Sequence, residues 1–264
     1  MVTKSVTLSE KRKGLSKRES YLLSYLSEKN KDIFKLKDVM KILGCSYSNA
    51  KVTAERLIKK KWIERLLKGR YMIIPFSAGI EGKYLEHEFI IASLFSGYIG
   101  YWTALNYYGF TEQIPDKIFI ASRKRLKDRT ILGIRLKFIS IDEKKFFGFK
   151  KIKILNHSIK ISNPEKTIID CLDKPKYCGG IGEIIKALEY GKEEINFKKL
   201  RRYALQIRNN SVIKRLGFIL EYLNLNTMEF EKLVGKGYSI LDPTKEKKRK
   251  YDSKWKLLVN IKYA

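Results

Sequence analysis

The first third of the chain alternates helical and strand-like hydrophobic patterns. Residues 1–18 are polar and basic without an apolar period, which predicts a flexible arm. Apolar residues then recur at helical spacing over 19–26, and a short apolar run at 33–36 predicts a strand. A second helix is predicted over 37–43, and Gly44 should end it because glycine tolerates the left-handed backbone that closes helices.

A third helix and a hairpin complete this pattern. Ser46 to Ser48 offer hydroxyls that can cap a helix running to about Lys61. Next, 63–67 and 71–75 read as two strands joined by a turn at Lys68-Gly69-Arg70. Helix, strand, helix, glycine turn, helix and hairpin is the order of a winged helix-turn-helix, which we place at 19–77. The buried stripe of the third helix is predicted to consist of Ala50, Ala54, Leu57, Ile58 and Trp62.

The remainder reads as a larger mixed α/β domain over 84–264, so the fold class expected for the chain is α+β. Residues 76–83 contain a serine and two glycines and make a plausible linker. From Met228 to its end the chain is predicted to be extended. Helices are predicted at 84–95, 101–108, 164–172, 181–189, 197–206 and 212–223, and strands at 118–121, 134–141, 151–155 and 158–161.

The charge balance points to a polyanionic partner. Lys and Arg number 56 against 28 Asp and Glu, a formal net charge of +28. Between Met1 and Ser77 the counts are 19 and 7, so the charge is densest in the predicted winged helix. Nucleic acid is the partner such a surface favours, although an anionic membrane would also attract it. The basic run 245–250 is expected to be solvated and could add nonspecific affinity for DNA.

Double-stranded DNA is the partner that this arrangement predicts. In a helix-turn-helix the second helix of the motif enters the major groove, and nearby cations contact phosphates. Asn49 is our candidate for base readout, because an amide can bond adenine N6 and N7 together. Use of the basic helix for protein contact is the alternative. The candidate DNA-binding residues are Ser46, Tyr47, Ser48, Asn49, Lys51, Val52, Lys59 and Lys60 on the helix, and Lys68 and Arg70 on the wing.

No cofactor or metal site is expected. The three cysteines, Cys45, Cys171 and Cys178, are too widely spaced for a zinc pattern, and His87 and His157 lie far apart. The sequence shows neither an apolar run of membrane-spanning length nor a signal peptide. We therefore expect a cytoplasmic protein.

Catalysis has one weak candidate. Asp116 and the sequence Glu143-Lys144-Lys145 match the sparse elements of a metal-dependent nuclease, in which acids hold Mg²⁺. Both acids fall outside the predicted strands, so we do not expect an enzyme. Aromatic residues crowd 98–110; they could stack on bases or a ligand, but their helical spacing favours core packing.

Four segments resemble the AbiEi family, the antitoxins of type IV toxin-antitoxin systems. They are KGRYMIIP (68–75), YIGYWTALNYYGFTEQIPDKIFIAS (98–122), ISNPEKTIIDCL (161–172) and the archaeal-type ending LDPTKEKKRKYDSKWKLLVNI (241–261). Their order along the chain carries the resemblance, since none is a catalytic motif. Pro164, Glu165, Thr167 and Asp170 in the third segment are explained by a helix start and packing, or they line a functional surface.

The resemblance implies a repressor that binds inverted repeats in its own promoter and an antitoxin that counteracts a nucleotidyltransferase-like toxin, with or without a stable complex. We expect a monomer or a weak dimer that pairs on DNA. The alternative is a stand-alone winged helix regulator whose second domain senses a ligand or dimerises. A metal-dependent nuclease is the third reading.

Overall fold

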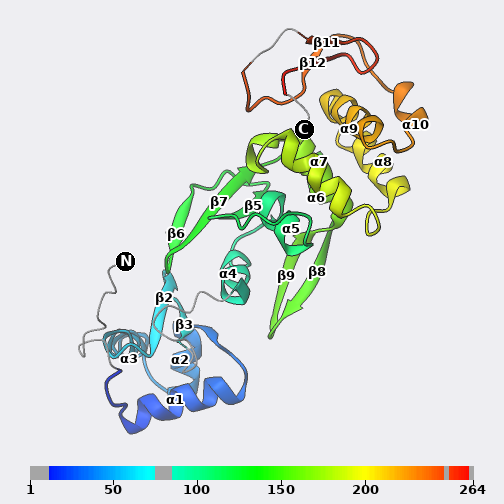
Figure 1. The fold of residues 1–264 in the computed structure, drawn as a ribbon. Helices are drawn as coiled ribbons and strands as arrows, with labels where there is room; N and C mark the ends of the chain where they lie inside the picture. Colours follow the sequence, from blue (N-terminus) through cyan, green and yellow to red (C-terminus); the bar gives the residue numbers. More distant parts are fainter. Residues whose placement is uncertain (1–11, 75–84, 247–249, 262–264) are drawn as a thin grey trace, which may run out of the picture. The chain divides into compact units, whose positions relative to one another are not determined.

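The chain folds into two compact units, Met1–Tyr84 and Leu85–Ala264, in a computed structural model (Figure 1). The structure describes residues 12–74, 85–246 and 250–261. The predicted linker at 76–83 lies outside the described residues. Each unit has its own hydrophobic core and is described by itself.

The N-terminal unit is a winged helix, as the sequence predicted. Its three strands form one antiparallel sheet in the order β1-β3-β2. Leu22, Leu26 and Leu57 are completely buried between the helices and this sheet. The elements are α1 (Lys17–Glu28), β1 (Ile33–Lys35), α2 (Leu36–Leu43), α3 (Tyr47–Lys59), β2 (Ile63–Leu67) and β3 (Arg70–Ile73).

The predicted flexible arm is wrong for its last residues. Helix α1 begins at Lys17, because Ser16 and Glu19 form a capping box that satisfies backbone N–H groups at the helix start. Just before it, the Arg12 guanidinium donates to the Ile74 carbonyl at 2.9 Å. Residues 12–18 therefore belong to the folded unit, and residues 1–11 lie outside the described residues.

The C-terminal unit is built on a six-stranded mixed sheet with the order β6-β7-β5-β4-β9-β8. Strands β5 and β7 run parallel, as do β4 and β9, and the other neighbours are antiparallel. Two of the strands, β4 and β6, were not predicted from the sequence; they have only two and three residues. The strands are β4 (Tyr98–Ile99), β5 (Ile118–Ser122), β6 (Arg129–Ile131), β7 (Ile134–Ser140), β8 (Phe149–Ile154) and β9 (His157–Ser162).

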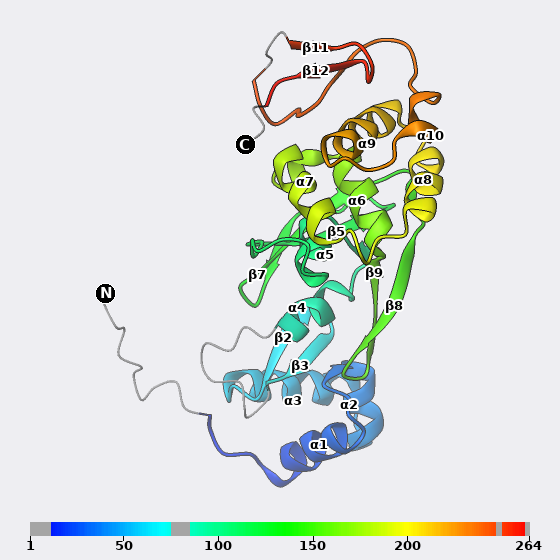
Figure 2. The same ribbon diagram turned by 45° about the vertical axis from the view of Figure 1, so that its right-hand side comes forward.

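Helices pack against this sheet and against one another. Helix α4 contacts β5 and β9, whereas α5 and α6 pack together beside β5 and β9 respectively. Figures 1 and 2 show α6 to α9 gathered between the large sheet and the strands β11 and β12. The helices are α4 (Leu85–Ala92), α5 (Tyr101–Tyr107), α6 (Pro164–Asp173), α7 (Ile181–Tyr190), α8 (Phe197–Gln206) and α9 (Asn210–Tyr222).

The chain after Met228 is not simply extended, which corrects that expectation. A short helix, α10 (Met228–Glu231), precedes a second sheet of three strands, β10 (Ser239–Ile240), β11 (Lys250–Asp252) and β12 (Leu257–Val259). Their order is β10-β12-β11, with β10 parallel to β12. Buried Arg215 of α9 donates to the carbonyls of Leu172 and Leu241 at 2.8 and 2.9 Å, which ties this segment to α6.

Polar residues of the ISNPEKTIIDCL segment are buried. Lys166 and Asp170 form an ion pair one turn apart on α6, and the Tyr98 hydroxyl donates to Asp170 Oδ2 at 2.8 Å. Glu165 and Thr167 are also buried. Burial raises the pKa of Asp170, while the Lys166 ammonium opposes that rise. These side chains therefore join β4 to α6 inside the unit, and Glu165, Thr167 and Asp170 do not line a surface.

None of the helices in the described residues combines the length and the apolar character that crossing a membrane requires.

Candidate nucleic-acid interface

Helix α3 begins at a serine cap and buries one side. The Ser46 hydroxyl accepts a hydrogen bond from the Asn49 backbone N–H at 3.3 Å, so its role is to start the helix. Ala50, Ala54 and Leu57 are completely buried. With 3.6 residues per turn, the opposite side carries Ser48, Val52 and Lys59, which are all exposed.

The exposed side of α3 combines polar, apolar and basic groups. Tyr47 and Val52 are 56% and 43% exposed, so this side presents apolar area to solvent beside its polar groups. Asn49 is exposed in the first turn, where a recognition helix reads bases. Lys51 lies 3.8 Å from Glu55, a loose pair between two solvated side chains.

The wing is short. Strands β2 and β3 are joined by Lys68 and Gly69 alone, and Gly69 has a φ of 72°, a conformation that glycine adopts without strain. The Gly69 carbonyl accepts from Leu36 N–H at 3.4 Å, so the turn lies at the start of α2. Arg70 lines a hollow of about 330 Å³ beside Lys35. The basic groups at the tip are therefore Lys35, Lys68 and Arg70.

Arg65 of β2 was missed by the sequence analysis. It is exposed and pairs in register with Tyr71 of β3, which places it on the sheet face that meets α3. Burial raises the pKa of Tyr71. Arg65 lowers this pKa, whereas Tyr47 and Glu55 raise it further, so these four groups are neighbours. Alternation along β2 does not single out Arg65, because a bulge between Arg65 and Leu67 interrupts the alternation.

Lys60, a predicted phosphate contact, forms an ion pair inside the N-terminal unit. Its ammonium lies 2.6 Å from Glu19 Oε2, a carboxylate that is almost completely buried at the start of α1. Burial alone would raise the pKa of Glu19, but hydrogen bonds from Lys60 and Ser16 outweigh it and hold the pKa below its ordinary value of 4.5. Lys60 therefore joins α3 to α1, and Glu19 already neutralises the charge that a phosphate contact would use.

This pair predicts a pH-dependent stability. Because the folded-state pKa of Glu19 is lowered, the pair stabilises the fold above pH 4.5 and loses its effect as the pH falls through the folded-state pKa. We expect Glu19→Gln to lower the free energy of unfolding by about 1–3 kcal/mol at pH 7. Urea unfolding of both chains from pH 7 to pH 3 should show this difference shrinking below pH 4.5. A difference that stays constant with pH would contradict the assignment.

The nuclease elements lie at opposite ends of two parallel strands. Asp116 precedes β5 and pairs with Arg135 at 2.8 Å, whereas Glu143 follows β7 and pairs with Arg123 at 2.7 Å. Because β5 and β7 are parallel and in register, the length of a five-residue strand, roughly 16 Å, separates the two acids. Among the described residues, no group of three His, Cys, Asp or Glu could hold a metal ion.

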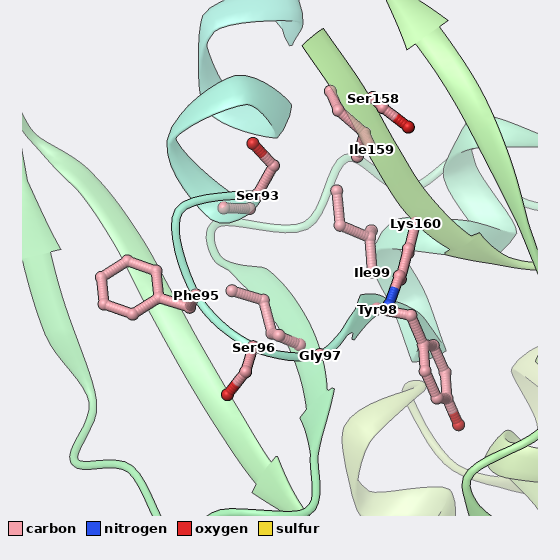
Figure 3. Close-up of a pocket in the computed structure, with 11 residues that line it drawn as sticks. Ser93, Phe95, Ser96, Gly97, Tyr98, Ile99, Ser158, Ile159 and Lys160 are labelled. Atoms are coloured by element: carbon pink, nitrogen blue, oxygen red, sulfur yellow. The ribbon is translucent and has the colours of Figure 1, made fainter. Parts of the chain in front are cut away.

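A hollow in the C-terminal unit bears on the ligand-sensing alternative. It has a volume of about 160 Å³ and lies beside the chain that leads from α4 into β4, with β9 on its other side. Figure 3 shows the hydroxyls of Ser93, Ser96 and Ser158 pointing in different directions, and Ser93 donates to the Ile90 carbonyl at 2.6 Å. These polar groups do not converge on one point, as those of a polar ligand site usually do.

Comparison with known proteins gives two findings for the chain. The family model described as "Transcriptional regulator, AbiEi antitoxin" matches residues 21–74. A solved structure, that of the RV2827C protein from Mycobacterium tuberculosis, superposes with a TM-score of 0.68 over 92% of each chain at 16% identity. At that identity the likeness shows a shared fold. No curated protein matches the chain.

The matched segment runs from the middle of α1 to the residue after β3, so it contains the last part of α1 and every later element of the winged helix. The match also includes residues 68–74 of the wing segment 68–75, which is one of the four segments that resemble the family. Residues 21–74 of this chain are therefore similar to the AbiEi antitoxin family of transcriptional regulators.

Proposed function

We propose that this protein is a sequence-specific, double-stranded DNA-binding repressor of its own operon. The observation that carries the proposal is the exposed side of α3, where Asn49 and Val52 stand free of the core. Tyr47, at the start of the same helix, shares its neighbour Tyr71 with the exposed cation Arg65 of β2. An amide that reads adenine, an apolar side chain that meets the thymine methyl group and nearby cations are the parts that major-groove recognition needs.

The proposed contacts divide into two kinds. Asn49 and Val52 contact base edges and determine which DNA sequence is recognised, and Tyr47 and Ser48 lie at the groove wall. Phosphate contacts add affinity that does not depend on the DNA sequence. We assign them to Lys51, Lys59, Arg65, Lys68 and Arg70. Ser46 acts by fixing the start of α3. A monomer or weak dimer that pairs on inverted repeats would place one α3 in each half-site.

The proposal also includes an antitoxin role. The winged helix matches a family model described as an antitoxin and transcriptional regulator, and we propose that the C-terminal unit counteracts a nucleotidyltransferase-like toxin from the same operon. Co-expression with the toxin tests this role separately from repression. Asn49→Ala should abolish repression and leave rescue of growth intact; loss of rescue in that variant would contradict a division of labour between the units.

Titration against the DNA upstream of the gene and against scrambled duplex tests DNA recognition. We expect Asn49→Ala to weaken binding to the upstream DNA by about 1–3 kcal/mol with little change on scrambled DNA, because only the base contact is lost. Arg65→Ala should weaken binding to both duplexes and reduce the slope of log K against log salt by about 1.

Lys29→Ala is the matched control, because Lys29 is an exposed cation at the C-terminal end of α1 that the proposed interface does not use. It should change neither affinity nor salt slope beyond twofold. Equal affinity of the unaltered chain for both duplexes would overturn sequence-specific recognition, and an Arg65 variant that behaves like the Lys29 variant would remove β2 from the interface.

A further inference from the structure

The small C-terminal sheet presents an exposed aromatic face. Ile240 of β10, Leu258 of β12 and Tyr251 of β11 pair in register across the three strands. Paired residues share a face, and so does Tyr238, two positions before Ile240. Tyr238 and Tyr251 are 46% and 62% exposed, whereas Leu257 and Val259 of the opposite face are buried. Figures 1 and 2 show β11 and β12 at the margin of the unit, beyond α9.

The two tyrosine rings form a pair on this face. Their centroids are 5.4 Å apart and their planes are nearly perpendicular, at 89°. In this arrangement the edge of one ring meets the face of the other, so each ring keeps at least one face that its neighbour does not cover. An exposed aromatic face of this kind can stack on a flat ligand.

Unneutralised positive charge lies next to the rings. The Lys256 ammonium lies over the Tyr238 ring, 5.7 Å from the ring centroid, and among the described residues Lys256 makes no ion pair. Lys254, two positions earlier, differs, because it pairs with Glu221 and Glu231 at 2.7 and 3.0 Å. Lys256 is therefore available to an external anion.

A second ammonium strengthens this field. Buried Lys214 of α9 donates to the carbonyls of Lys236 and Gly237, at the foot of Tyr238. Burial lowers the pKa of Lys214, and the nearby Lys256 lowers it further, which places the two cations together. Two cations beside exposed rings favour an anionic partner that has flat groups.

We propose that the outer face of the β10-β12-β11 sheet is a binding site for single-stranded nucleic acid. Unpaired bases stack on Tyr238 and Tyr251, and Lys256 and Lys214 attract the phosphates. Every base has a π-face, so stacking on tyrosine tolerates many sequences, and a duplex hides those faces. This site is distinct from the winged helix, whose candidate partner is duplex DNA.

The test is fluorescence anisotropy of the full chain with a labelled twelve-nucleotide oligouridylate, an oligothymidylate of the same length and a scrambled duplex. Tyr238→Leu and Tyr251→Leu should each weaken binding to both single strands at least about fivefold and leave duplex binding unchanged, because leucine keeps apolar area but has no π-face. Tyr238→Phe and Tyr251→Phe should stay within twofold of the unaltered chain.

Tyr190→Leu is the control, since Tyr190 is an equally exposed tyrosine at the end of α7. It should not change binding. The proposal is overturned if the unaltered chain binds neither single strand, if the leucine variants bind as tightly as the phenylalanine variants, or if duplex binding falls in parallel. A face that instead binds a protein would give the first of these results. Both tyrosines are exposed, so thermal unfolding should confirm that all variants fold.

Discussion

Asp170→Asn should destabilise the chain by about 3–5 kcal/mol, because it leaves the Lys166 ammonium buried without its counter-charge. The Lys166 side chain is completely buried, and its carboxylate partner lies one turn away on α6. Asparagine has the shape of aspartate, so the loss would come from charge rather than from a cavity. Urea unfolding of the full chain measures the effect.

The double variant Lys166→Met with Asp170→Asn tests this cause. Removing both charges avoids the buried lone cation, so the double variant should be more stable than Asp170→Asn alone. The exposed pair of Arg123 and Glu143 is the control, since Glu143→Gln should change stability by less than about 1 kcal/mol. If the loss of stability in the double variant equals the sum of the losses in the two single variants, the interpretation is refuted.

The sequence predicted most of the N-terminal unit because its signals are local. Ser46 and Gly44 mark helix ends through bonds to their own neighbours, and Gly69 marks the hairpin turn. The start of α1 was missed by two residues, although Ser16 and Glu19 have the spacing of a capping box. That signal was present in the sequence and was overlooked.

The contacts of the candidate site that the sequence did not predict have a tertiary cause. Lys59 and Lys60 are neighbours in sequence, but Lys60 turns towards α1 and meets Glu19, 41 residues away. Arg65 reaches the α3 side of the sheet only because β2 and β3 pair in the observed register. Neither fact follows from periodicity, since both depend on which elements pack together.

The C-terminal segments were harder to predict for the same reason. β4 has two residues and becomes a strand because β5 and β9 lie on either side of it. β10 joins β12 in parallel across an intervening segment of the chain. Such short strands carry little pattern of their own, so the last part of the chain appeared extended without its pairing being visible.

Gly217 and Trp255 make the second large prediction. Trp255 is completely buried against α9, and a Cβ on Gly217 would lie 2.0 Å from the Trp255 ring, which is too close for any side chain. The indole N–H also donates to Glu221 of the same helix. Trp255→Ala should therefore cost about 3–5 kcal/mol, and Gly217→Ala about 1–3 kcal/mol through overpacking.

The two changes should not be additive. In the Trp255→Ala background the space beside Gly217 is open, and alanine favours a helix over glycine, so Gly217→Ala should there stabilise the chain by up to about 1 kcal/mol. Gly182→Ala in α7 is the control, because nothing lies within 4 Å of its added Cβ and no clash should appear. If Gly217→Ala is equally destabilising in both backgrounds, Trp255 is not what requires glycine. A reversal of sign would show that this contact fastens the three-stranded sheet to α9, and so sets the position of the proposed tyrosine face.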